Sequence, residues 1–214
     1  MGLGIGLAGS LLLSASALQA APATAKFALD GATGTVSVKG ASAPKAATVG
    51  TELSTGDTVT TGKASTADVG VIIGNRKVSN IQVWPSSSYT VGQTTVDDSG
   101  AVKSAATLGD GSVSGSFNPK VAASELTVGT PNVSFVIRDS SSFLIQSAGN
   151  VYCYAGSILV TSSGNTYTLL PGQAFIAASS TVVPHNLPAP LRIVSAPVIQ
   201  ITSPTTSTSQ PGGR

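Results

Sequence analysis

Short strand-like runs separated by glycine turns dominate the chain from Lys26 to Ile201 and constrain its fold more than any other feature. Gly34–Val38, Asp57–Thr61 and Asn165–Leu169 alternate β-branched or apolar residues with small polar ones. A period of two residues is typical of a half-buried strand. The 24 glycines interrupt such runs, and no stretch shows the apolar stripe of a capped helix. We predict an all-β, single-domain fold of β-sandwich or jelly-roll type, with a short β-solenoid as the alternative.

The two ends of the chain differ from this central part. Residues 1–25 carry no charge, and Leu3–Leu13 is an apolar run followed by small residues, as in a signal peptide, although no basic residues precede it. A retained membrane anchor is the alternative, but Gly, Ser, Gln and Thr dilute the segment below the span of about 20 apolar residues that a bilayer needs. We expect a signal peptide at 1–25, an all-β domain at 26–201 without a transmembrane helix, and a disordered Ser/Thr/Pro tail at 202–214.

The charge and cysteine content indicate the class of partner and the compartment. Charged residues make up 9% of the chain, against about 25% in an average soluble domain. They are scattered singly, so no basic block can bind a phosphate backbone, and nucleic acid is excluded as a partner. One cysteine, Cys153, allows no internal disulfide and is expected to be a small buried apolar side chain. An exported chain without disulfides predicts a periplasmic or extracellular location in a bacterium.

No set of residues predicts catalysis or metal binding. His185 is the only histidine and has neither a G-x-S-x-G serine nor an orienting carboxylate pattern, so we expect it in a surface loop. Asp97-Asp98 precedes Ser-Gly as in a turn and lacks the spacing of a calcium loop. Gly109–Ser112 lacks the lysine and helix of a phosphate loop and predicts a hairpin turn. We predict no enzyme, cofactor or metal. Two carboxylates facing across a cleft would indicate an enzyme instead.

Three aromatic residues are candidates for partner binding: Trp84, Tyr152 and Tyr154. Tyr152 and Tyr154 flank Cys153 in a strand-like run, so they share one face while the cysteine takes the other. Side chains of this kind can pack across strands, or they can line a groove for a sugar or a peptide.

The segment Gly50–Gly62, GTELSTGDTVTTG, has regularly spaced glycines and apolar residues. On physical grounds, Gly56 and Asp57 form a tight turn and Val59 points into a core. The segment resembles the opening of FecR-type domains, whose pattern is G-x-x-L-x-x-G-D-x-V-x-T-G.

Later segments are similar to the same family in the same order, so that the resemblance spans about Thr35 to Ala178. They are the strand–turn–strand from Ala67 to Ser86, Thr130-Pro131-Asn132 before an apolar strand that runs to Arg138, the Gly149–Val160 hairpin and the closing Tyr167–Ala174. One departure is RDSSSF at Arg138–Phe143, where the family shows R-G-T-x-F. We expect a remodelled turn there.

The resemblance implies a module of the bacterial cell envelope. The best-known FecR-type proteins are regulators with a cytoplasmic anti-sigma segment, one membrane helix and an extracytoplasmic domain that meets an outer-membrane receptor. This chain is similar to the extracytoplasmic part alone. The implied function is non-enzymatic binding of an envelope or outer-membrane protein, as a sensor or scaffold. The alternative is a surface adhesin or carbohydrate-binding β-sandwich, which an exposed row of Trp84, Tyr152 and Tyr154 would favour. The sequence specifies no oligomeric state.

Overall fold

The computed structural model describes residues 25–40 and 42–189, which form strands joined by turns. The strands are β1 (Ala25–Thr33), β2 (Val36–Lys39), β3 (Lys45–Ala46), β4 (Glu52–Leu53), β5 (Thr58–Thr61), β6 (Thr66–Ile73), β7 (Arg76–Val83), β8 (Ser88–Val96), β9 (Val102–Asp110), β10 (Ser112–Phe117), β11 (Glu125–Gly129), β12 (Val133–Gln146), β13 (Val151–Ser162), β14 (Asn165–Leu169), β15 (Gln173–Ile176) and β16 (Thr181–Pro184). Within the described ranges, no helix is long and apolar enough to cross a membrane. The predicted signal peptide, apart from Ala25, and the predicted tail lie outside them.

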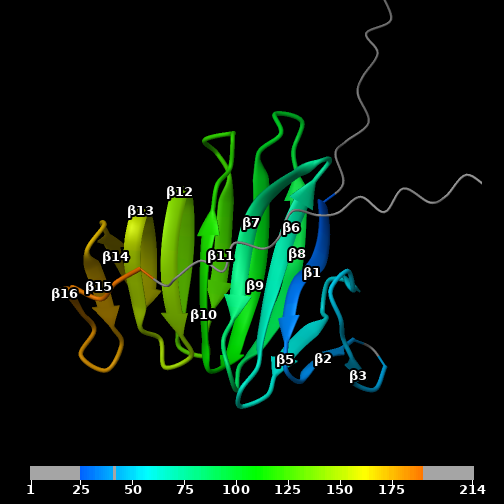
Figure 1. The fold of residues 1–214 in the computed structure, drawn as a ribbon. Coiled ribbons are helices and arrows are strands. Elements are labelled where there is room, and N and C mark those ends of the chain that lie inside the picture. The colour runs from blue at the N-terminus through cyan, green and yellow to red at the C-terminus, as the bar shows by residue number, and fades with distance from the viewer. Residues whose placement is uncertain (1–24, 41, 190–214) are drawn as a thin grey trace, which may run out of the picture.

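All of these strands belong to one continuous sheet that curls over, so that two layers face each other (Figure 1). One layer has the order β4-β1-β6-β7-β10, and the other has the order β3-β2-β5-β8-β9-β11. The long strand β12 joins them, because its first half pairs with β11 and its second half with β10. β13 pairs along the other side of β12 and continues the sheet to β14 at one end and to β15 and β16 at the other.

The sheet changes layer where β12 bends. The register between β12 and β13 shifts between Arg138 and Ser142, and Asp139 has a φ of 57°. Opposite this point, Gly156 in β13 has a φ of 74°. The hydroxyl of the buried Ser141 donates a hydrogen bond to the Arg138 carbonyl oxygen within the bend. An irregularity of this kind bends a strand and increases its twist. The segment that departs from the FecR-type pattern is therefore the corner of the fold.

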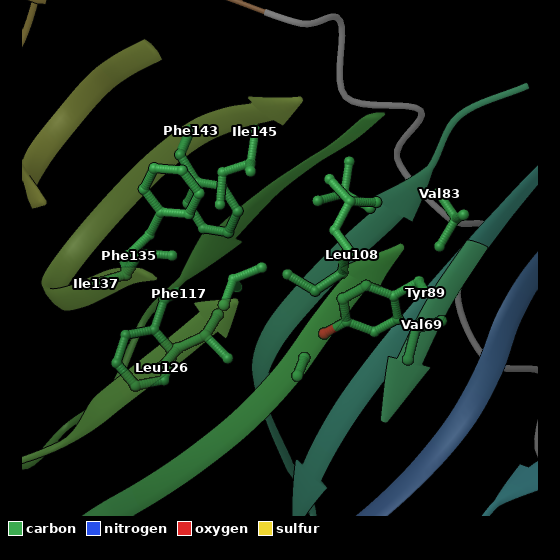
Figure 2. Close-up of a cluster of buried hydrophobic side chains, with 14 of the residues drawn as sticks. Val69, Val83, Tyr89, Leu108, Phe117, Leu126, Phe135, Ile137, Phe143 and Ile145 are labelled. Carbon is green, nitrogen blue, oxygen red and sulfur yellow. The ribbon is translucent and has the colours of Figure 1, made fainter. Parts of the chain in front are cut away.

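The core lies between the two layers and is built from alternate residues of their strands. Figure 2 shows Tyr89 and Leu108 of one layer near Val83 of the other, and Phe135 and Phe143 from the two halves of β12. Both phenylalanines are fully buried. A single core therefore spans both layers, and β12 contributes to it on both sides of its bend.

The segment Gly50–Gly62 takes the conformation that its spacing predicts. Gly56 has a φ of 93°, which favours glycine, and the Asp57 carboxylate accepts a hydrogen bond of 2.7 Å from the Ser54 backbone N–H. Val59 has no exposed surface and belongs to the core. The predicted turn at Gly56-Asp57 and the inward direction of Val59 are confirmed.

The predicted all-β fold class is confirmed. A β-solenoid of stacked coils has parallel ladders, but the only parallel pair of the described strands is β9 with β11. Every other described ladder is antiparallel. The arrangement is thus a sandwich of two layers within one sheet.

Two predicted local features are wrong. Gly149–Val160 does not form a hairpin, because Val151–Ser162 is the single strand β13. The turn at Gly109–Ser112 does not close a hairpin, because β9 pairs with β8 and β11 while β10 pairs with β7 and β12. The chain crosses there from one layer to the other.

Candidate functional site

Tyr152 and Tyr154 lie on the outer face of β13 and are both half-buried. Cys153, between them, points to the core and has no exposed surface. The alternation expected for this strand is therefore confirmed. Burial raises the pKa of Tyr154, and the nearby Tyr152 adds to the rise. A phenol with a raised pKa is neutral at physiological pH, so Tyr154 offers an aromatic ring and a hydroxyl group without charge.

His185 lies between these two tyrosines. Its ring centroid is 5.4 Å from that of Tyr152 and 5.1 Å from that of Tyr154, and both pairs meet edge to face. Nε2 lies 3.1 Å from the Cys153 carbonyl oxygen. A carbonyl oxygen can only accept, so Nε2 carries the hydrogen of this bond. Nδ1 is buried and has no hydrogen-bond partner among the described residues. We call Tyr152, Tyr154 and His185 the aromatic surface.

The single histidine and the single cysteine meet through the backbone and do not form a catalytic pair. His185 contacts the carbonyl oxygen of Cys153, whereas the thiol lies on the opposite face of the strand, 3.5 Å from the Ala155 carbonyl oxygen. Burial raises the pKa of Cys153 to about 11. A nucleophilic cysteine needs a thiolate, so this thiol is an inert part of the core.

Trp84 directly follows β7 and lies on the same outer face. Ile81 and Val83 of β7 point into the core, so Gln82 and Trp84 point outward. The Trp84 indole is half-buried, and its Nε1 donates a hydrogen bond of 2.9 Å to the Ser114 hydroxyl oxygen. Its polar atom is thus already satisfied within the protein.

Two strands separate Trp84 from the aromatic surface. The order β7-β10-β12-β13 places Ser114 and Leu144 between Gln82 and Tyr152, and neighbouring strands are about 4.8 Å apart, so β7 and β13 are about 14 Å apart. The three predicted binding residues therefore share one face of the sheet but do not form a contiguous row.

The segment that carries the aromatic surface contains no charged side chain. Every Lys, Arg, Asp and Glu of the described residues lies at or before Asp139, and none occurs from 140 to 189. We call residues 140–189 the uncharged end. Two of its large apolar side chains are exposed: Leu170 at 54% and Leu187 at 50%. The turns that carry them are adjacent, because the His185 N–H donates to the Gly172 carbonyl oxygen at 2.8 Å.

The Asp97 carboxylate is bound within its own turn. Asp97 accepts a hydrogen bond from the Ser99 hydroxyl, and it accepts two more from the backbone N–H groups of Ser99 and Ala101, at 2.9 and 3.0 Å. The bond from the hydroxyl, together with those from the backbone, lowers the pKa of Asp97. The described residues contain no group of three or more His, Cys, Asp or Glu side chains that could hold a metal ion. Asp97-Asp98 is therefore a turn, as its sequence predicts.

A second acidic pair lies on the outer face of β1 and β6. Lys77 Nζ lies 2.5 Å from the Asp30 carboxylate. Burial raises the pKa of the neighbouring Asp68, Lys77 opposes this shift, and Asp30 adds to it. The lysine thus compensates two carboxylates that both lie close to the sheet.

His185 is the member of the site that the sequence does not reveal. It lies more than thirty positions after the tyrosines and reaches them only because β15 and β16 fold back along β13. The expected surface loop begins after β16, but the ring in it is half-buried between the two tyrosines. Its neighbours, Pro184 and Asn186, give no local signal for this contact.

Comparisons with known proteins give no family assignment. No protein-family model and no curated protein matches the chain. Two solved structures of a putative anti-sigma factor from Parabacteroides distasonis ATCC 8503 are similar to it, each with a TM-score of 0.48 and 11% sequence identity. Each match covers 62% of this chain and 60% of that chain, which is less than two thirds of either. At this identity and TM-score, the likeness carries no argument for a shared function.

Proposed function

We propose that this chain is a non-enzymatic, FecR-like module of the bacterial cell envelope that binds a protein partner through the aromatic surface of Tyr152, Tyr154 and His185. The observation that carries the proposal is the half-exposed tyrosine pair held on a sheet strand of the uncharged end. Protein interfaces are enriched in tyrosine and depleted of acidic residues and lysine at their centres.

The geometry of the aromatic surface favours recognition by a rigid site. The histidine ring holds both tyrosines edge to face, and its own position is set by the hydrogen bond to the Cys153 carbonyl oxygen. A side chain that is already ordered loses less conformational entropy when a partner binds. The exposed Leu187, two residues after His185, extends the apolar area that a partner could cover.

The FecR-like assignment and export are supported by the residues. The Gly50–Gly62 segment has the family spacing and a turn at Gly56-Asp57, with Val59 in the core. The departure at Arg138–Phe143 coincides with the bend of β12. The apolar, uncharged residues 1–25 support export.

The test is a pull-down from solubilised bacterial envelope fractions with the purified, tagged chain, and captured proteins are identified by mass spectrometry. We expect one membrane protein to be enriched, and we expect Tyr152→Ala with Tyr154→Ala to abolish its capture. Truncating a central interface tyrosine costs about 2 kcal/mol or more of binding free energy.

The matched control is Val49→Ala. Val49 is 61% exposed but lies far along the chain from the aromatic surface, between β3 and β4. It should leave capture unchanged. Thermal unfolding of each variant shows whether the fold is intact. Undiminished capture by the folded double tyrosine variant would contradict the proposed surface.

Carbohydrate binding is the second candidate, because Trp84 shares the outer face with the tyrosines. A sugar platform needs exposed ring faces, whereas these tyrosines pack against His185 and lie about 14 Å from the strand of Trp84. Capture of glycans or cell-wall fragments alone in the same experiment, lost in Trp84→Ala, would replace the first proposal.

A further inference from the structure

The described part of the sheet ends at four edge strands. β3 pairs only with β2, β4 only with β1, β14 only with β13, and β16 only with β15. An edge strand exposes unpaired N–H and C=O groups that can pair with another chain, and proteins block such edges with charge, proline or short length.

Three of the four edges are blocked. β3 and β4 are two residues long, and each exposes a charge, Lys45 and Glu52. Pairing of either strand with its copy would bring like charges together. β16 ends at Pro184, which has no N–H, and His185 directly after it packs on the two tyrosines.

β14 has none of these features. It is five residues long and contains neither charge nor proline, and Asn165, Thr166 and Thr168 are exposed. Its neighbour Leu170 is one of the exposed large apolar residues. β15 pairs with the opposite end of β13, so it does not cover the β14 edge by pairing.

The turn before β14 determines which backbone groups face the open edge. Ser163 and Gly164 have φ values of 50° and 80°, and Ser162 pairs with Asn165 across them. Two positive φ values between paired strands are typical of a two-residue type I′ hairpin, whose flanking residues exchange both backbone hydrogen bonds. Bonded pairs then alternate along the ladder. Thr166 and Thr168 therefore direct their N–H and C=O groups away from β13.

We propose that two copies of this chain associate through β14, which pairs antiparallel with β14 of the second copy around a two-fold axis at Tyr167. In this register Thr166 lies opposite Thr168 of the second copy, and the outward N–H and C=O groups of both threonines form backbone hydrogen bonds. The edge carries no charge, so two copies can meet across a two-fold axis without like-charge repulsion. Cross-strand threonine pairs are favourable.

The same register explains the exposure of Leu170. Counting outward from Tyr167 places Leu170 opposite Gly164 of the second copy. The space beside Gly164 is open, since no atom lies within 4 Å of the position that a Cβ would take. The second copy can thus cover this leucine. The interface lies on β14, not on the aromatic surface, so it does not depend on the proposed function.

The test is analytical ultracentrifugation of the full chain over a wide concentration range. We expect the average mass to rise from one chain toward two with increasing concentration. Thr166→Lys with Thr168→Lys places two like-charge pairs across the axis and should weaken association by roughly tenfold or more. Thr166→Glu with Thr168→Glu should do the same. Mixing the two variants should restore a dimer, because opposite charges then face each other.

The control is Ala105→Lys with Thr107→Lys, which adds the same charge at exposed positions of β9, a strand paired on both sides. It should associate as the unmodified chain does. Thermal unfolding checks that every variant is folded. A chain that stays monomeric at all concentrations would overturn the proposal. So would a dimer that persists in both charged variants, or a mixture that fails to associate.

Discussion

Residues 25–139 and the uncharged end, residues 140–189, share one core but have very different surfaces. The first region carries all the charged side chains of the described chain, including the ion pairs Lys77–Asp30 and Arg138–Glu125, and its edge strands are short and charged. The second carries Tyr152, Tyr154, exposed leucines and an open edge strand. Burial requirements are the same on both sides of the bend in β12, so the two regions differ in their surfaces and not in their core.

The substitution with the largest expected effect on stability, Phe143→Ala, tests whether the two regions unfold together. Phe143 lies in the core just after the bend. Phe143→Ala should lower the free energy of unfolding by about 3–5 kcal/mol, because it leaves a cavity. Urea unfolding followed by fluorescence of Trp84, the only tryptophan, reports on the first region. A shift of the Trp84 transition shows one cooperative unit, and an unchanged transition would show two. Val49→Ala is the control, with an expected change within about 0.5 kcal/mol.

Alanine substitutions at two glycines of the uncharged end test how tightly the bend in β12 is packed. Gly156 and Gly164 have φ values of 74° and 80°, so alanine at either should cost about 1–2 kcal/mol of stability from the left-handed backbone alone. A Cβ at Gly156 would also overlap the Ser141 hydroxyl and lie 2.8 Å from the Ser140 carbonyl oxygen, whereas Gly164 has open space. Gly156→Ala should therefore cost about 1–3 kcal/mol more than Gly164→Ala. Equal losses in urea unfolding would show that the bend is not tightly packed.

Asp68, in the first region, should make stability depend on pH in the acid range, and the sign of this dependence follows from its raised pKa. Burial raises the pKa of Asp68 in the folded state, so the folded chain binds a proton more tightly than the unfolded chain. Stability from this group is therefore greatest at low pH and is lost as pH rises from the ordinary aspartate pKa through the raised value. Asp68→Asn should raise the melting temperature at neutral pH and leave it nearly unchanged in acid.

Asp97→Asn is the matched control for Asp68. Hydrogen bonds lower the pKa of Asp97, so its contribution is present above the ordinary aspartate pKa and is lost as pH falls through the lowered value. The two variants should change the pH profile of the melting temperature in opposite directions. Profiles that shift in the same direction would contradict the burial of the Asp68 carboxylate.

The smallest expected effect is on the reactivity of the Cys153 thiol, which lies beneath the aromatic surface. With its pKa raised to about 11 by burial, the thiol should react with a thiol reagent at pH 8 only after the chain unfolds. The reaction rate in increasing urea should follow the unfolding transition. Rapid reaction of the native chain would show that the uncharged end opens locally.

The strands and several turns could be predicted from the sequence because alternation and turn chemistry are local properties. The inward Val59, the turn at Gly56-Asp57, the buried Cys153 and the shared face of Tyr152 and Tyr154 are all confirmed. Each depends on neighbours only a few positions away in the chain, and these fix the face of a strand or the type of a turn.

The partners of each strand were decided only in the tertiary structure. Nothing near Gly109–Ser112 distinguishes a hairpin from a crossing between layers, because that choice depends on which distant strands compete for β9 and β10. The aromatic surface forms for the same reason, since His185 reaches Tyr152 and Tyr154 through the pairing of β15 and β16. The sequence by itself determined which residues face the core. The long-range pairing of strands decided which outward residues meet, because backbone hydrogen bonds between strands carry no information about the identity of their side chains.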